Sequence, residues 1–197
     1  MQLTADIPYG GAAFFAGSSS VLKAGIGAGL SKIIKVVEKG LWSHCGYVRV
    51  SPTGTILLFE STIWDGVSGP QWNNFADRLP EYRNGGMVVV IPYRKETAPD
   101  PTNIENATSQ LIALRMSGVC HYAVGDLFAD LINYTLLHRF LHWAAKKLQN
   151  SYSLVCSECL RLVTDPTANI QSCKGVTPEQ EYERALTLGG PPIQVVP

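Results

Sequence analysis

The sequence predicts an α+β domain in which helices surround one mainly antiparallel sheet. Short apolar runs bounded by turn residues are typical of strands, and two of them flank the turn-forming segment Ser51-Pro52-Thr53-Gly54. Longer stretches with apolar residues at helical spacing dominate the second half of the chain. Neither an internal repeat nor a linker composition interrupts the 197 residues, so we expect a single domain over 1–197.

Composition narrows the function classes. Apolar residues make up 46% of the chain and charged residues 16%, which is typical of a globular protein. The formal net charge is zero, so no basic footprint for nucleic acid or an anionic membrane is expected. The N-terminus lacks a basic signal-peptide region and no apolar run has spanning length, which gives a soluble, by default cytoplasmic, expectation. Five cysteines, an odd number, argue against a closed disulfide framework.

The strands and helices are predicted from these patterns in chain order. We expect strands at 12–16, 44–50, 55–61, 87–91 and 193–196, and helices at 18–37, 72–79, 103–116, 126–149, 154–164 and 178–186. Residues 96–103 are polar and contain proline, which favours a surface connection. The 126–149 stretch is apolar on more than one face, so it is either deeply buried or partly covers a site.

The hairpin register decides which side chains meet across the strands at 44–50 and 55–61. A three-residue loop pairs Val50 with Gly54 and places His44 directly opposite Glu60. A four-residue loop places those two side chains on opposite faces of the sheet. A functional role for the pair therefore requires a loop of odd length.

The segment around Cys156 indicates nucleophilic chemistry. Cys156 would lie in the first turn of a helix, where unpaired backbone N–H groups and the helix dipole favour a thiolate and could later hold an oxyanion. A thiol nucleophile also needs a base and a group that orients the base. His44 is the candidate base, and Glu60, an acid at the end of an apolar strand, is the candidate orienting group.

Five segments in this order carry a resemblance to a known family: Phe14-Phe15-Ala16-Gly17, Trp42-Ser43-His44-Cys45-Gly46-Tyr47-Val48, Phe59-Glu60-Ser61, Gly66-Val67 and Val155-Cys156-Ser157-Glu158-Cys159-Leu160. Together they resemble the circularly permuted NlpC-type papain-like cysteine hydrolases of the YiiX/YaeF-like branch, over about residues 6–187. The resemblance implies a permuted papain-like fold, with the cysteine helix packed on a central antiparallel sheet that bears the histidine and the acid.

The same resemblance implies amide, peptide or acyl hydrolysis through a thioester, without a cofactor or metal. Cys156 corresponds to the nucleophile, His44 to the base and Glu60 to the orienting acid. Tyr122 is the nearest match to a tyrosine near the family's site, where it would donate to the oxyanion or substrate. Residues 125–150 would be a helical elaboration. The substrate would be a small peptide, amide or acyl-bearing molecule, such as a cell-wall peptide or a lipid-linked compound.

Several other readings of these residues remain open. Cys156 could be a buried structural cysteine, in a binding module that keeps the fold without catalysis. A zinc site could instead use Cys156 and Cys159 with Cys120 and His121. Cys45 should face away from His44 into the core, and Glu158 is expected to be an exposed or helix-capping acid. The sequence does not indicate the oligomeric state.

Overall fold

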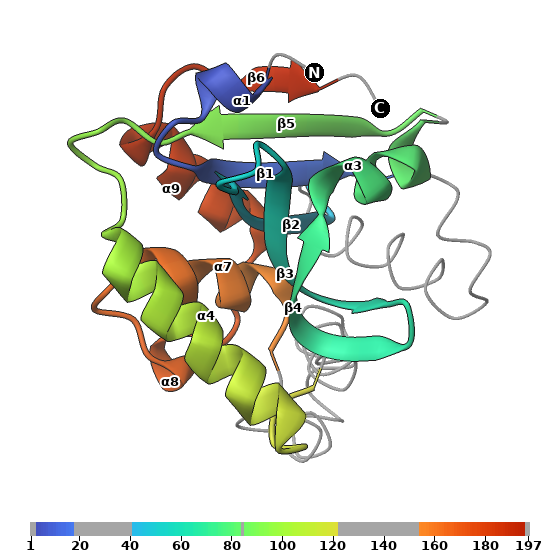
Figure 1. Cartoon of the computed structure of the whole chain (residues 1–197), viewed down its shortest axis with the longest axis vertical. Coiled ribbons are helices and arrows are strands. Elements are labelled where there is room, and N and C mark those ends of the chain that lie inside the picture. The colour runs from blue at the N-terminus through green and yellow to red at the C-terminus, as the bar shows by residue number, and fades with distance from the viewer. Residues whose placement is uncertain (1–2, 18–40, 84, 122–153, 196–197) are drawn as a thin grey trace, which may run out of the picture.

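The computed structural model describes residues 3–17, 41–83, 85–121 and 154–195, and these residues form an α+β fold around one six-stranded sheet (Figure 1). The strand order is β4-β3-β2-β1-β5-β6, and every neighbouring pair is antiparallel. The predicted class and the antiparallel sheet are therefore confirmed. Within these residues, no helix combines the length and the apolar character that crossing a bilayer requires.

The elements follow one another in the order that the sequence patterns predict for most of the chain. They are α1 (Leu3–Asp6), β1 (Gly11–Ala16), β2 (His44–Val50), β3 (Ile56–Trp64), β4 (Val67–Asn74), α3 (Phe75–Arg78), the 3₁₀ helix η2 (Leu79–Tyr82), β5 (Met87–Pro92), α4 (Pro101–Met116), α7 (Cys156–Thr164), α8 (Ile170–Cys173), α9 (Pro178–Leu188) and β6 (Ile193–Val195). The helices predicted at 18–37 and 126–149 lie outside the described residues.

The prediction of one helix over 72–79 is wrong. Strand β4 continues to Asn74 and pairs with β3 along its whole length, with Trp72 opposite Phe59. The helix begins only after Asn74, whose side chain accepts a hydrogen bond from the backbone N–H of Ala76 and so caps α3. Pairing with a strand that is already in the sheet outweighs the local helical pattern, because it satisfies the backbone and partly buries the Trp72 ring.

The two faces of the sheet bury different clusters. On one face α7, α4 and α9 cover side chains that include Phe14, Cys45 and Phe59, and this cluster also contains Cys156. On the other face α1, α3 and η2 cover a second cluster, whose members in the sheet include Ala13, Phe15, Val48, Leu58, Val88 and Val90. Neighbours along β1, β2 and β3 fall into different clusters because strand side chains alternate between faces.

The β2–β3 hairpin has neither of the predicted loop lengths. Val50 pairs with Ile56, so five residues form the loop, and Tyr47 pairs with Phe59. Continuing this register brings Gly46, not His44, opposite Glu60. The prediction of direct opposition is therefore wrong by two residues. The loop length is still odd, so His44 and Glu60 share a face and lie diagonally across the two strands.

Gly46 allows the close approach of β3 at this point. A Cβ atom placed on it would lie 2.7 Å from the carbonyl oxygen of Phe59 and 2.7 Å from a methyl carbon of Leu58. No side chain fits in that space without moving the backbone of β3. The absence of a side chain here leaves the diagonal between His44 and Glu60 open.

The start of α7 is fastened to the sheet by hydrogen bonds. The Ser61 hydroxyl on β3 donates to the carbonyl of Leu154 at 2.7 Å, and the Leu154 N–H donates to the carbonyl of His121 at 3.1 Å. Leu160 and Val163 on the helix are buried in the cluster beneath it. These contacts set where the first residue of α7, Cys156, lies relative to the ends of β2 and β3.

Candidate active site

Cys156 and His44 meet at one end of the sheet, although they belong to different faces. Cys156 is the first residue of α7 and lies in the cluster on the α7 face. His44 is the first residue of β2, and its ring packs against Phe15 on the other face, with ring centroids 5.5 Å apart. Around the end of the strand, the charge of each group acts on the other. The segments that carry them are separated by more than a hundred positions in sequence and are joined only by the fold.

The pair lies just beneath the molecular surface. Cys156 is 4% exposed and the side chain of His44 is 12% exposed. A buried charge pair of this kind is poorly screened by solvent, so each charge acts strongly on the other. Solvent therefore reaches only a small fraction of either residue.

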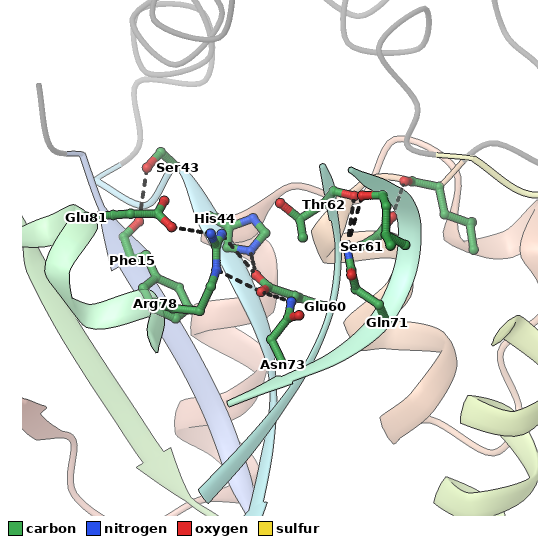
Figure 2. Close-up of polar contacts among 12 residues, drawn as sticks. Phe15, Ser43, His44, Glu60, Ser61, Thr62, Gln71, Asn73, Arg78 and Glu81 are labelled. Carbon is green, nitrogen blue, oxygen red and sulfur yellow. Dashed lines mark hydrogen bonds and ion pairs between the residues drawn. The ribbon is translucent and has the colours of Figure 1, made fainter. Parts of the chain in front are cut away.

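Glu60 engages the other side of the His44 ring. Its Oε2 contacts His44 Nε2 (Figure 2). With Nε2 facing the carboxylate, Nδ1 is the ring nitrogen that remains for the thiol. The carboxylate thus fixes the ring orientation that a thiol–imidazole pair needs.

Glu60 is itself held in a closed set of contacts. It is 0% exposed, and its Oε1 accepts a hydrogen bond from Asn73 Nδ2 at 2.7 Å. Arg78 Nε lies 2.8 Å from the same oxygen, and Arg78 Nη2 donates to Oε2 at 3.4 Å. Burial raises the pKa of Glu60, but the positive charges of His44 and Arg78, with the hydrogen bonds from His44 and Asn73, outweigh it and lower the pKa.

Arg78 has three partners of its own. Its side chain is 5% exposed and also pairs with Glu81 in η2, on the side away from Glu60. The guanidinium carbon lies 4.4 Å from the centroid of the Trp64 ring, which gives a cation–π contact. Figure 2 shows Arg78 between the two carboxylates, next to the His44 ring.

The environment of Cys156 favours the thiolate. A hydrogen bond with the Cys45 side chain and the charge and hydrogen bond of His44 overcome the effect of burial, and lower the pKa of Cys156 well below its ordinary value. Burial lowers the pKa of His44, but the negative charges of Cys156 and Glu60 raise it to about 10. The two shifts together favour a thiolate–imidazolium pair at neutral pH.

Cys45 faces away from His44, as predicted, but this orientation brings it to Cys156. It is 0% exposed and shares the α7-face cluster with Cys156. Burial and its contact with Cys156 raise the pKa of Cys45 well above its ordinary value, so Cys45 stays a neutral thiol. A neutral thiol can donate its hydrogen to the Cys156 sulfur.

Glu158 caps the helix that carries Cys156. Its Oε2 accepts the backbone N–H of Val155 at 3.1 Å, and its Oε1 accepts that of Gly175 at 3.0 Å. Lys174 Nζ lies 3.5 Å from Glu158 Oε2. The capping role is the predicted one, but Glu158 is 2% exposed and therefore buried. The first N–H groups of a helix have no partner within it, so those at the start of α7, where Cys156 lies, can serve as donors for an oxyanion.

The structure brings together the three residues that sequence reasoning singled out, Cys156, His44 and Glu60. Tyr122 lies outside the described residues. Asn73, Arg78 and the thiol contact of Cys45 were not predicted. The alternation along β4 would have paired Asn73 with the face of Glu60, had residues 72–74 been read as a strand.

The alternative of a zinc site is not supported by the residues that the structure describes. No group of three or more His, Cys, Asp or Glu side chains there is placed to hold a metal ion. All five cysteines are free thiols and buried. The geometry of the described residues thus presents Cys156 to the His44 ring, not to a set of metal ligands.

Comparisons with known proteins add no family to this description. A scan of the chain against protein-family models found no match, and a search of the curated proteins found none that is similar. The function is therefore argued from the geometry and chemistry of the site.

Proposed function

We propose that this protein is a thiol hydrolase that cleaves an amide, peptide or acyl bond through a thioester on Cys156. The observation that carries the proposal is the row formed by Cys156, His44 and Glu60, in which a helix N-terminal thiol contacts an imidazole held by a buried carboxylate. The cysteine helix lies against the strands that bear the histidine and the acid, and the histidine and acid come first in the chain. This order supports a circularly permuted papain-like arrangement.

The reaction follows from the charges of the row. The Cys156 thiolate attacks the substrate carbonyl carbon, and the carbonyl π electrons move to its oxygen, which backbone N–H groups at the start of α7 stabilise. The oxyanion collapses, the bond to the leaving group breaks, and the His44 imidazolium donates its proton to the departing nitrogen or oxygen. A thioester and a neutral His44 remain.

Water then completes the cycle. Neutral His44 takes a proton from a water molecule as its oxygen attacks the thioester carbon. Collapse of the second oxyanion breaks the carbon–sulfur bond, releases the acid product and restores the thiolate–imidazolium pair. Glu60 keeps its charge throughout and stabilises the imidazolium. The chain's own residues and water supply every atom and proton of this sequence, so the proposal requires no cofactor.

Acylation of Cys156 by activated substrates tests the proposal. We expect 4-nitrophenyl esters and anilides to release nitrophenol or nitroaniline with an acyl group trapped on Cys156, located by mass spectrometry after acid quenching. His44→Ala should lower the acylation rate by about 10²- to 10⁴-fold. Cys173→Ser, at a buried cysteine beyond the site, is the matched control and should acylate as the parent protein does.

The rival class, a non-catalytic binding module, gives a different result. It would acylate slowly, without dependence on His44, or at another cysteine. That outcome would contradict the hydrolase proposal. A series of acyl chains and short peptides in the same assay separates lipid-like from peptide substrates through their relative kcat/KM.

A further inference from the structure

The cation beside Glu60 extends the row of charges at the site. From α3 to α7 the groups in contact are Arg78, Glu60, His44 and Cys156, which carry positive, negative, positive and negative charge in the protonation states favoured above. Because the signs alternate, every charge in the row has only opposite charges as its neighbours in the row. A cation at the far end makes the row neutral overall, in a region where an unbalanced charge is costly.

Both oxygens of Glu60 are fixed by this arrangement. Oε1 meets Asn73 at 2.7 Å and Arg78 Nε at 2.8 Å, while Oε2 meets His44 and, at 3.4 Å, Arg78 Nη2. The carboxylate cannot rotate without losing one of these contacts. In addition, a permanent cation opposes the transfer of a proton from the His44 ring to Glu60, which would leave both groups neutral.

We propose that Arg78 is a positioning residue that keeps Glu60 charged and directed at His44. It thereby maintains the Cys156 thiolate through the contacts of Glu60 and His44. Its catalytic meaning rests on the proposed thiol chemistry, but its effect on the thiolate does not. Arg78 touches neither the sulfur nor a reacting bond in this scheme, since Glu60 and His44 stand between.

Other charged and titratable groups face this row and enter the expected pH behaviour. Glu81 in η2 pairs with Arg78 from the side away from Glu60 and partly balances its charge. The Tyr82 hydroxyl group, also in η2, is buried near Arg78, Glu81 and Glu60, and burial raises its pKa so that it stays neutral. On β4 the neutral Asn73 faces Glu60, and on β2 the neutral Cys45 faces Cys156.

The experiment measures the pH dependence of Cys156 alkylation by iodoacetamide, which reports the thiolate and needs no hydrolysis. Cys156 and Cys159 share the tryptic segment between Lys147 and Arg161, so tandem mass spectrometry assigns the modified sulfur. Arg78→Met removes the positive charge at the end of the row, so the row has a net negative charge. That net charge disfavours the Cys156 thiolate. We expect the acid midpoint of alkylation to rise by about one pH unit.

Arg184→Met is the matched control. Arg184 also pairs with a 0% exposed carboxylate, Glu181, at 2.9 Å, and that carboxylate likewise keeps a second partner, Arg161. Both variants lose a buried ion pair, but Arg184→Met can act on the sulfur only through Glu181 and Cys45, so Arg78→Met should move the midpoint further. If the two variants lose stability alike and neither moves the midpoint, Arg78 is structural only and the inference is overturned.

If Arg78→Met does not fold, Arg78→Lys tests whether Arg78 positions Glu60. Lysine keeps the charge, but its single nitrogen cannot contact Glu60 at two places and Glu81 at a third, as the three guanidinium nitrogens of Arg78 do. We expect the midpoint to stay near that of the parent, while the plateau alkylation rate falls several-fold relative to Arg184→Lys; equal rates overturn the inference. A shifted alkylation midpoint without any acyl-enzyme would support the role of Arg78 and contradict the hydrolase proposal. Normal acylation with an unmoved midpoint would support the hydrolase proposal and contradict the role of Arg78.

Discussion

His44 and Glu60 lie diagonally across β2 and β3, with Gly46 filling the position directly opposite the acid. The register Tyr47 to Phe59 fixes this diagonal, and the missing side chain at Gly46 keeps it clear. Diagonal neighbours on one face are farther apart than direct neighbours, so only long side chains meet there. Histidine and glutamate both have that reach, which explains why a ring and a carboxylate contact each other at this point.

Glu60→Gln tests what the carboxylate contributes. The amide keeps the size and one acceptor but removes the charge that raises the pKa of His44, so the imidazolium becomes less stable. We expect kcat/KM to fall by about 10²-fold or more, with the His44 ring titrating at lower pH in ¹H–¹⁵N NMR. Loss of activity with an unchanged His44 titration would contradict an electrostatic role.

Glu60→Gln also removes the ion pair between Arg78 and Glu60, while the pair between Arg78 and Glu81 remains. Breaking a buried pair by removing one partner costs about 3–5 kcal/mol. The free energy of unfolding should therefore be measured in urea alongside the kinetics. Activity is to be compared at a temperature where both proteins are folded.

The dependence of stability on pH follows from the shifts at Cys156 and His44. Unfolded, the two groups titrate near their ordinary values of 9.0 and 6.5; folded, the pKa of Cys156 is well below 9.0 and that of His44 is about 10. Between pH 6.5 and 9.0 the folded ion pair and the unfolded neutral pair each hold one proton, so this pair adds no slope. Below pH 6.5 the unfolded chain binds more protons, and above pH 9.0 the folded protein holds more, so stability falls on both sides.

Cys156→Ala tests the ion pair through His44. Burial lowers the pKa of His44, and the charge of Cys156 is the largest of the causes that raise it to about 10. Without the thiolate only Glu60 opposes the effect of burial, so we expect the His44 ring of the variant to titrate at a lower pH than in the parent protein, measured by ¹H–¹⁵N NMR. An unchanged His44 titration would argue against the ion pair.

The parts of the fold that depend on local pattern could be predicted from the sequence. The short apolar runs at 44–50 and 87–91 predict β2 and β5, and Thr177 before Pro178 marks the start of α9, where its hydroxyl accepts the Gln180 N–H. Cys156, His44 and Glu60 could also be identified. A cysteine in the first turn of a helix indicates a nucleophile, a histidine indicates its base, and an acid at the end of an apolar strand indicates the group that orients the base. That His44 and Glu60 share a face of the hairpin depends on an odd loop length, which the sequence left open.

The remaining features depend on contacts between distant segments. Residues 72–74 are a strand because β3 is available to pair with them, which no local pattern at 70–80 encodes. The roles of Asn73 and Arg78 follow from that strand and the short helix after it. The face of Cys45 was predicted, but its contact with Cys156 requires knowing that α7 covers that face.

Cys45→Ala tests the thiol contact to the nucleophile. The hydrogen bond from Cys45 is the first cause of the lowered pKa of Cys156, so its removal should raise that pKa and the acid midpoint of iodoacetamide alkylation. Cys173→Ala removes an equally buried thiol away from the site and should leave the midpoint in place. Equal midpoints in the two variants would show that the Cys45 hydrogen does not act on the sulfur.

Glu158→Ala separates support of the helix from chemistry at its first residue. The change leaves the N–H groups of Val155 and Gly175 without their acceptor, and a buried donor left unsatisfied costs about 1–3 kcal/mol. We expect that loss in the free energy of unfolding, measured in urea, with Glu158→Gln losing less because its amide oxygen can accept one of the two bonds. Because a carboxylate near the sulfur disfavours the thiolate, neither variant should raise the alkylation midpoint of Cys156. A raised midpoint in the folded variants would mean that Glu158 positions the sulfur as well as capping α7.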